Sequence, residues 1–115
     1  MQAYKVENNE ILIVDEETGE PGYFCEKDIG EAFAKSLREI RKAAGLTLVQ
    51  LGKIIGMPNQ TLSAYERNIR IPSISQALNI TAYFGFTIED FITSGLGLRN
   101  IDIVEEYELT NPPQN

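Results

Sequence analysis

The stretch from Gly45 to Pro72, GLTLVQLGKIIGMPNQTLSAYERNIRIP, decides the fold, because it encodes two short helices joined by a tight turn. Gly45 can adopt the left-handed conformation that ends a preceding helix. Thr47 is followed three residues later by Gln50, which is the Thr-x-x-Gln pattern of a capping box. Apolar residues then recur at helical spacing and predict a helix over about residues 48–55.

A second helix follows after a turn of about three residues. Gly56 ends the first helix, and Pro58 fixes the backbone at the start of the second, which we expect at about residues 59–67. Leu62 and Tyr65 are three residues apart and would face inward. The other face would carry Asn59, Gln60, Ser63 and Ala64.

The outward face of this second helix is polar but almost uncharged. Amide side chains carry a donor and an acceptor on one plane, which suits bidentate hydrogen bonding to adenine in the major groove of DNA. We therefore expect Asn59 and Gln60 to read bases. The alternative is a solvated helix N-terminus, since asparagine is also a good cap. The two-helix setting favours the DNA interpretation.

Residues 28–92 resemble the Xre/Cro family of helix-turn-helix repressors. The resemblance rests on Leu37-Arg38-Glu39-Ile40-Arg41, Gly45-Leu46-Thr47, Leu51, Gly56, Thr61-Leu62-Ser63, Tyr65-Glu66-Arg67, Pro72, and Leu78 through Phe84-Gly85. It implies a mainly α fold, a lambda-repressor-like DNA-binding bundle of five helices whose third helix lies in the major groove. Short accessory β-strands at the two termini would complete the fold.

The resemblance also implies roles for individual residues. Base edges would be contacted by Pro58, Asn59, Gln60, Ser63 and Ala64, the last through its methyl group alone. A structural ion pair would join Arg41, late in helix one, to Glu66 at the end of helix three. The chain departs from the family pattern at Leu48, where many members carry glutamine, and at Asn68, where glycine is usual. The first change removes one contact to DNA, whereas asparagine at position 68 still tolerates the left-handed conformation.

Three further helices complete the expected bundle. Helix one would begin with a capping box of Asp28 and Glu31, and its core stripe would be Ile29, Phe33, Leu37, Ile40 and Ala44. Ser73 would cap a fourth helix that runs to about residue 84, with Leu78, Ala82 and either Ala77 or Thr81 facing inward. Thr87 and Asp90 would open a short fifth helix that packs through Ile88, Phe91 and Ile92.

The charge of the chain argues against DNA binding. The 115 residues include 10 basic and 17 acidic side chains, for a net charge of −7, whereas a DNA-binding domain is usually basic. The charge is uneven, because residues 1–30 carry −6, residues 31–96 carry +2 and residues 97–115 carry −3. We expect Lys53, Arg67 and Arg70 to contact phosphates, although ordinary solvation of each is the alternative. So few cations predict a shallow salt dependence.

The sequence divides into an N-terminal extension (1–27), a helix-turn-helix domain (28–95) and a C-terminal extension (96–115). Residues 10–15, EILIVD, and Tyr23-Phe24-Cys25 flank a Glu- and Gly-containing loop and predict a β-hairpin. The alternation of Ile101 and Ile103 predicts another strand over residues 100–104, which Tyr107 and Leu109 would extend. The final TNPPQN is expected to be disordered.

These short strands need partners, because an isolated pair is not stable. We expect part of the pairing to join two copies of the chain across an exposed edge strand, the alternative being an intramolecular sheet that covers the bundle. A homodimer would place two recognition helices about 34 Å apart along the duplex.

The composition argues against several other classes of protein. No apolar run approaches the roughly 20 residues of a membrane span, and the acidic N-terminus does not resemble a signal peptide, so we expect a cytoplasmic protein without a membrane partner. With no histidine and the single Cys25, the chain offers no zinc site and no Ser/His/Asp triad. No metal, cofactor or catalytic residue is therefore expected.

These patterns together predict a transcriptional regulator that binds double-stranded DNA sequence-specifically, as a dimeric repressor of a palindromic operator. The alternative is an autoregulating antitoxin, or another protein-interaction module, whose acidic terminal segments bind a partner protein. An adjacent gene encoding a small basic protein would favour this alternative.

Overall fold

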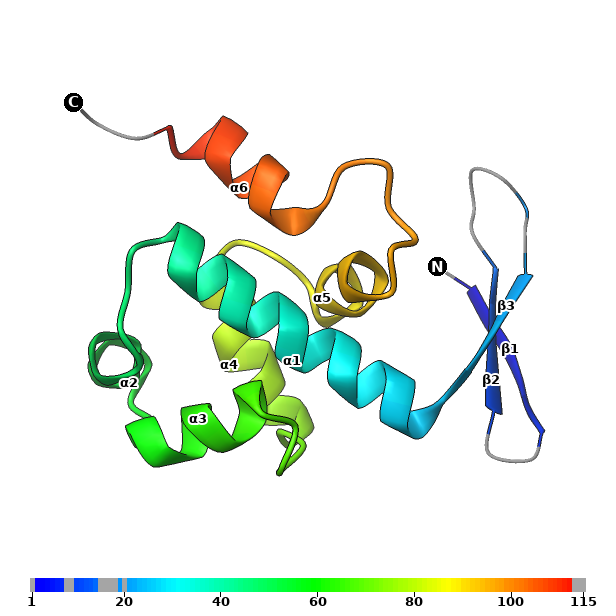
Figure 1. Ribbon diagram of the computed structural model, residues 1–115, viewed down its shortest axis with the longest axis horizontal. Coiled ribbons are helices and arrows are strands. Elements are labelled where there is room, and N and C mark those ends of the chain that lie inside the picture. The colour runs from blue at the N-terminus through cyan, green and yellow to red at the C-terminus, as the bar shows by residue number, and fades with distance from the viewer. Residues whose placement is uncertain (1, 8–9, 15–18, 20, 113–115) are drawn as a thin grey trace.

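The computed structural model describes residues 2–7, 10–14, 19 and 21–112 (Figure 1). Three strands precede six helices in this part of the chain. In order they are β1 (Gln2–Glu7), β2 (Glu10–Val14), β3 (Pro21–Cys25), α1 (Glu26–Ala43), α2 (Leu48–Ile55), α3 (Asn59–Glu66), α4 (Ile74–Tyr83), α5 (Ile88–Gly95) and α6 (Ile103–Thr110). The fold is mainly helical, and α1 to α5 are the five helices predicted for the bundle.

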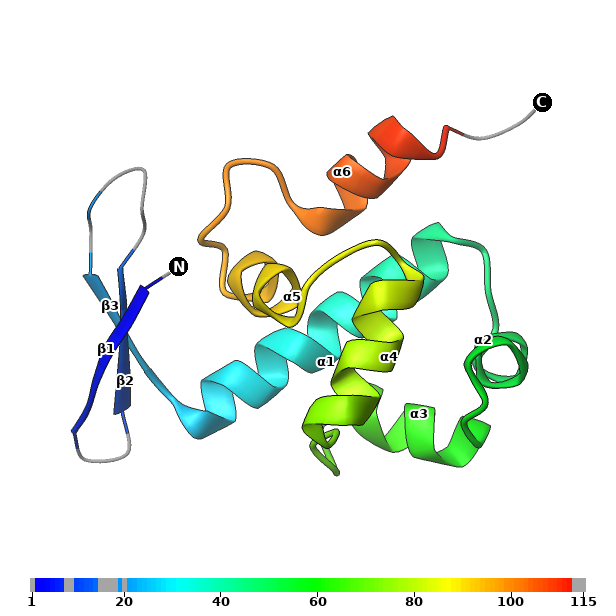
Figure 2. The same cartoon turned by 180° about the vertical axis from the view of Figure 1, so that it is seen from behind.

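The three strands form one antiparallel sheet in the order β1-β2-β3. Leu12 lies opposite Tyr23 in the pairing of β2 with β3, which confirms the predicted hairpin. Strand β1 was not predicted, and the two residues between β1 and β2 lie outside the described part of the chain. The strands therefore pair within one chain, and Figures 1 and 2 place the sheet beside the first turn of α1, away from α2 and α3.

Helix α1 begins directly after β3, three residues earlier than a cap at Asp28 requires. The Asp28 carboxylate accepts hydrogen bonds from the Cys25 backbone N–H (2.9 Å) and from the Cys25 thiol (3.1 Å). These bonds to the ionised form lower the pKa of Asp28 below its ordinary value. The predicted capping box of Asp28 and Glu31 is therefore wrong, because Asp28 is the third residue of the helix and reaches back to Cys25.

The predicted N-caps of α2, α4 and α5 are confirmed, and the structure shows a capping box at each of them, including one at Ser73 that was predicted only as a cap. The boxes pair Thr47 with Gln50, Ser73 with Gln76 and Thr87 with Asp90, and in each the first side chain accepts from the backbone N–H of the second. Gly56 ends α2 with a φ of 74°, in the left-handed region where a Cβ would be strained. Local residues therefore define both ends of α2, as the sequence predicted.

The core lies between α1 and the helices that surround it. Helix α1 buries Phe33, Leu37 and Ile40 as predicted, and it packs against α5, which crosses it and is seen nearly end-on in Figures 1 and 2. Gly95 permits this approach, since a Cβ there would lie 2.2 Å from the carbonyl oxygen of Ala32. Glycine at position 95 therefore allows the last turn of α5 to lie directly against α1.

Helix α4 is rotated relative to the prediction. It buries Ala77, Ile80 and Thr81, while Leu78 and Ala82 are exposed. Both faces of α4 carry apolar residues, so the spacing alone did not select the right one. The prediction that Leu78 and Ala82 face the core is therefore wrong.

The predicted C-terminal strand is also wrong, because residues 103–110 form α6. The Asp102 side chain caps this helix by accepting from the Glu105 backbone N–H at 2.8 Å. Ile103 is fully buried in the core, and Tyr107 packs against it one turn later. Arg99, before the helix, forms ion pairs with Glu106 of α6 and with Asp90 of α5, the latter at 4.0 Å. These contacts attach the C-terminal extension to the bundle.

Candidate nucleic-acid interface

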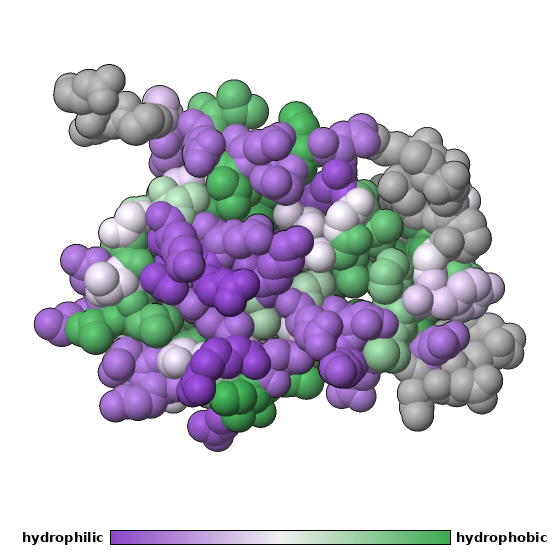
Figure 3. Space-filling view, viewed as in Figure 1, coloured by the Kyte–Doolittle hydropathy of each residue, from purple (hydrophilic) through white to green (hydrophobic). Residues whose placement is uncertain are grey.

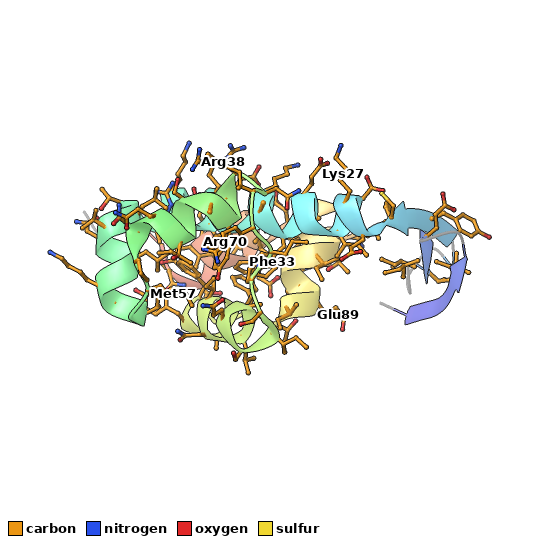
Figure 4. All side chains as sticks on the ribbon, turned by 90° about the horizontal axis from the view of Figure 1, so that it is seen from below. Lys27, Phe33, Arg38, Met57, Arg70 and Glu89 are labelled. Carbon is orange, nitrogen blue, oxygen red and sulfur yellow. The ribbon has the colours of Figure 1, made fainter. Side chains whose placement is uncertain are left out.

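Helices α2 and α3 meet at a three-residue turn, from Gly56 to Pro58. The Met57 backbone N–H donates to the carbonyl oxygen of Gly52 at 2.9 Å. A Cβ on Gly52 would lie 2.4 Å from the Met57 carbonyl oxygen, so glycine is required for this close approach. Met57 lies at the corner between the two helices in Figure 4 and packs against the core. The turn therefore holds α3 at a fixed angle to α2.

The start of α3 carries the predicted base-reading residues at the surface. Pro58 and Gln60 are exposed, and Asn59 and Ser63 are partly exposed. Pro58 is the N-cap, and its ring provides no hydrogen-bond acceptor for the helix. Asn59 is the first residue inside α3, so it is not the N-cap of this helix.

Ala64 does not belong to this exposed face. Its exposed fraction is 8%, and it is buried together with Leu62 and Tyr65. The loop after α3 folds back on it, with the backbone N–H groups of Ile69 and Arg70 donating to its carbonyl oxygen at 2.9 and 3.3 Å. A side chain this buried offers little surface to a base, so we leave Ala64 out of the proposed base-contacting set.

An ion pair fixes the other end of α3. Arg41 donates to Glu66 through two nitrogens, Nε at 2.6 Å and Nη2 at 2.9 Å. Its third nitrogen, Nη1, donates to the Leu46 carbonyl oxygen at 2.7 Å. Both side chains are largely buried, with 11% and 6% of their surfaces exposed. The pair joins α1, the loop before α2 and the end of α3, and its hydrogen bonds raise the pKa of Arg41.

The end of α3 has the backbone conformation expected at Asn68. Its φ is 54°, in the left-handed region where glycine is usual, and its backbone N–H donates to the Tyr65 carbonyl oxygen. The Tyr65 hydroxyl in turn donates to the side chain of Gln76. This hydrogen bond connects α3 to α4, so the helix is held on both sides.

The three predicted phosphate contacts lie on different parts of this surface. Lys53 is exposed on α2, Arg67 follows α3 directly, and Arg70 lies in the loop before α4. Arg67 lines a shallow hollow together with Lys35 and Arg38 of α1, and Glu31 and Glu66 line the same hollow. Sequence reasoning did not assign roles to these two α1 residues, although their spacing of three placed them on one helix face.

The surface around these cations is mainly hydrophilic. Figure 3 shows this over α1 and α3, and Figure 4 shows Arg38 at the edge of the molecule formed by α1. A hydrophilic, locally basic surface beside an exposed amide-bearing helix is what contact with a phosphate backbone requires. In the described residues no group of histidine, cysteine and carboxylate side chains could hold a metal ion. None of the described helices has the length and apolar character to cross a membrane.

Comparison with known proteins agrees with this geometry. The profile of the Helix-turn-helix family matches residues 37–91. The chain is 33% identical over 54 residues to the uncharacterized HTH-type transcriptional regulator YgzD of Bacillus subtilis (strain 168), a stretch that is 47% of this chain and 82% of that protein. No solved structure matches the chain. The chain belongs to the Xre-like helix-turn-helix family, a class of DNA-binding regulators of transcription.

Proposed function

We propose that this protein is a sequence-specific regulator that represses transcription by binding a palindromic operator in double-stranded DNA as a homodimer. The proposal rests on the exposed start of α3. The buried ion pair of Arg41 and Glu66 fixes the other end of this helix. When the protein binds DNA, α3 enters the major groove, and Asn59 and Gln60 at its start face the base edges. Pro58 and Ser63 lie beside them and complete the base-contacting set.

The cations around α3 position the protein on the duplex. We assign phosphate contacts to Lys53, Arg67 and Arg70, which are all exposed. Each subunit has few cations and so neutralises few phosphates, which makes the electrostatic contribution to its DNA affinity small. Each neutralised phosphate steepens the fall of log K with log salt concentration by about 0.9. A second subunit on a second half-site supplies the affinity that one subunit lacks.

Gln60→Ala should weaken binding to the selected operator by about 1–3 kcal/mol and relax the preference at one base pair, because a bidentate contact is lost. The operator is first obtained by selection from random duplexes at a stated salt concentration. Dissociation constants are then measured for the operator and for each single-base variant. Glu108→Gln, an exposed change on α6, is the control and should leave the profile unchanged. An unaltered profile for Gln60→Ala would show that this residue does not read bases.

Lys53→Ala should weaken binding to all sequences alike and reduce the salt slope by about one, because it removes a phosphate contact without touching a base. The measurement is the dissociation constant for the operator and for an unrelated duplex over a range of salt concentrations. Lys27→Ala is the matched control, since Lys27 is exposed at the far end of α1, next to the sheet (Figure 4). An equal change of slope in both variants would indicate a general effect of charge rather than a contact.

The acidic terminal segments support a second candidate function, that of an autoregulating antitoxin or protein-interaction module. Residues 1–30 and 97–115 carry net charges of −6 and −3. On α6, the exposed residues Glu105, Glu108 and Leu109 combine charge with an apolar side chain. A basic protein partner fits this surface. Co-expression with the products of neighbouring genes, followed by purification on the tagged chain, tests this candidate.

A further inference from the structure

Helix α4 carries two amide side chains that bond the helices α2 and α3. The Asn79 side-chain amide donates to the carbonyl oxygen of Ile55, the last residue of α2, at 3.0 Å. Gln76, three residues earlier, accepts a hydrogen bond from the Tyr65 hydroxyl of α3. Residues three apart lie on one side of a helix, so one side of α4 contacts both α2 and α3. Figure 2 shows α4 beside these two helices.

The bond from Asn79 meets a backbone group that has no donor within its own helix. The last four carbonyl oxygens of an α-helix have no intrahelical donor, and Ile55 ends α2. The next residue, Gly56, has the left-handed conformation, and Pro58 then caps α3. Asn79 therefore holds α2 at the point where the chain turns towards the base-contacting residues.

Both bonds start from a helix that is itself firmly held. Ala77, Ile80 and Thr81 bury one face of α4 in the core. Gln76 belongs to the capping box at the start of α4, where the Ser73 backbone N–H also donates to its side-chain oxygen at 3.4 Å. The two amides therefore hold α2 and α3 against the same fixed element.

We propose that Asn79 and Gln76 are positioning residues, which set the orientation of α2 and α3 and thereby the sequence selectivity of DNA binding. The inference rests on the proposed function, because it concerns how the start of α3 meets the base edges. A site that distinguishes bases must be held within about 0.5 Å and 10–20° of its productive geometry. Asn79 is exposed, and water competes for an exposed hydrogen bond, so this contact contributes more to orientation than to overall stability.

The first test replaces Asn79 by alanine, which removes the donor but favours the helical state of α4, since alanine has the highest helix propensity. The ratio of the dissociation constants for an unrelated duplex and for the selected operator should fall about two- to tenfold, the factor that one lost hydrogen bond makes in an equilibrium. Partial unfolding would instead weaken binding to both duplexes equally and leave this ratio unchanged. Tyr65→Phe keeps the buried ring, removes the hydroxyl that bonds Gln76, and has the same expected result.

Asn111→Ala is the matched control. The Asn111 side-chain amide also donates to a carbonyl oxygen in the last turn of a helix, that of Tyr107 in α6, at 3.2 Å. Asn111 is exposed, as Asn79 is. Its bond lies within the C-terminal extension, so this variant should keep the ratio of the wild type.

Amide hydrogen exchange followed by NMR tests the same contacts without DNA. The backbone N–H groups of Met57 and Leu62 form hydrogen bonds at the turn and at the start of α3. Their exchange should be about two- to tenfold faster in Asn79→Ala and in Tyr65→Phe than in the wild type. The Leu98 N–H, which forms a hydrogen bond after α5, should exchange at the wild-type rate, because only a general loss of stability would reach it.

The two measurements separate this inference from the proposed function. Unchanged exchange at Met57 and Leu62 in both variants would overturn the inference, and so would faster exchange in variants that keep the wild-type selectivity. Faster exchange together with a lower selectivity ratio supports the inference and the proposed function. If exchange is faster but the wild type selects no DNA sequence, the contacts of α4 still hold α2 and α3, and the proposed function fails.

Discussion

Glu66→Ala should lower the free energy of unfolding by about 3–5 kcal/mol, because it leaves the guanidinium of Arg41 buried without its anionic partner. The remaining hydrogen bond, from Arg41 to the Leu46 carbonyl oxygen, does not neutralise the charge. A loss of this size is a large fraction of the 5–15 kcal/mol typical of a folded domain. Chemical denaturation of the variant and the wild type at neutral pH measures it.

Two further variants separate the buried charge from other causes. Glu39→Ala removes an exposed carboxylate from α1 and should change stability by less than about 0.5 kcal/mol. The double variant Arg41→Met with Glu66→Leu removes both charges, and it should recover most of the loss, because apolar replacement of a buried pair is often close to neutral. If Glu66→Ala costs no more than Glu39→Ala, the ion pair does not stabilise the fold.

Phe91→Ala should also cost about 3–5 kcal/mol, because it empties the centre of the core. Phe91 is fully buried, and its ring centroid lies 5.3 Å from that of Phe33 and 6.3 Å from that of Phe86. Its backbone carbonyl oxygen accepts a hydrogen bond from the buried Ser36 hydroxyl at 2.6 Å. The cavity therefore opens where α1 packs on α5, and thermal or chemical unfolding measures the loss.

Tyr23→Ala is the matched control for this cavity. Tyr23 is also aromatic, but it is exposed on β3, so its removal should cost less than about 1 kcal/mol. Below its unfolding transition, Phe91→Ala should still bind the operator, because the residue lies in the core and not at the base-contacting end of α3. Equal costs for the two variants would show that the α1–α5 contact contributes little to stability.

Most of the helices could be predicted because their ends are encoded by nearby residues. Thr47 with Gln50, and Thr87 with Asp90, lie three residues apart and need no distant partner to form a cap. The first helix was placed too late because its cap is a cysteine. Cys25 is not among the residues that usually cap helices, and here it acts through Asp28.

The choice of buried face was predictable only where one face is apolar. Helix α1 has a single apolar stripe, whereas α4 carries Ile74 and Leu78 on one face and Ala77 and Ile80 on another. Periodicity does not distinguish two such faces. The same ambiguity affected residues 103–110, where Ile103 and Tyr107 are four apart and suit a helix as well as an extended strand.

The candidate site was predictable as far as its residues lie within α2 and α3. The sequence placed Asn59 and Gln60 at the start of α3, but it did not show that Ala64 is buried or that the chain after α3 returns to bond its carbonyl oxygen. The sequence also did not predict that Arg67 and Lys35 of α1 line the same hollow, because their proximity depends on how α1 and α3 cross. Such relations come from tertiary packing and leave no local pattern.

The capping boxes and the glycine that ends α2 have a consequence for how the chain reaches its native state. Each short helix can start and stop on information held within a few neighbouring residues, so few long loops must close before the first turns form. Small helical proteins in which local contacts dominate fold within microseconds to milliseconds. We therefore expect the helical bundle of each chain to form soon after its synthesis ends.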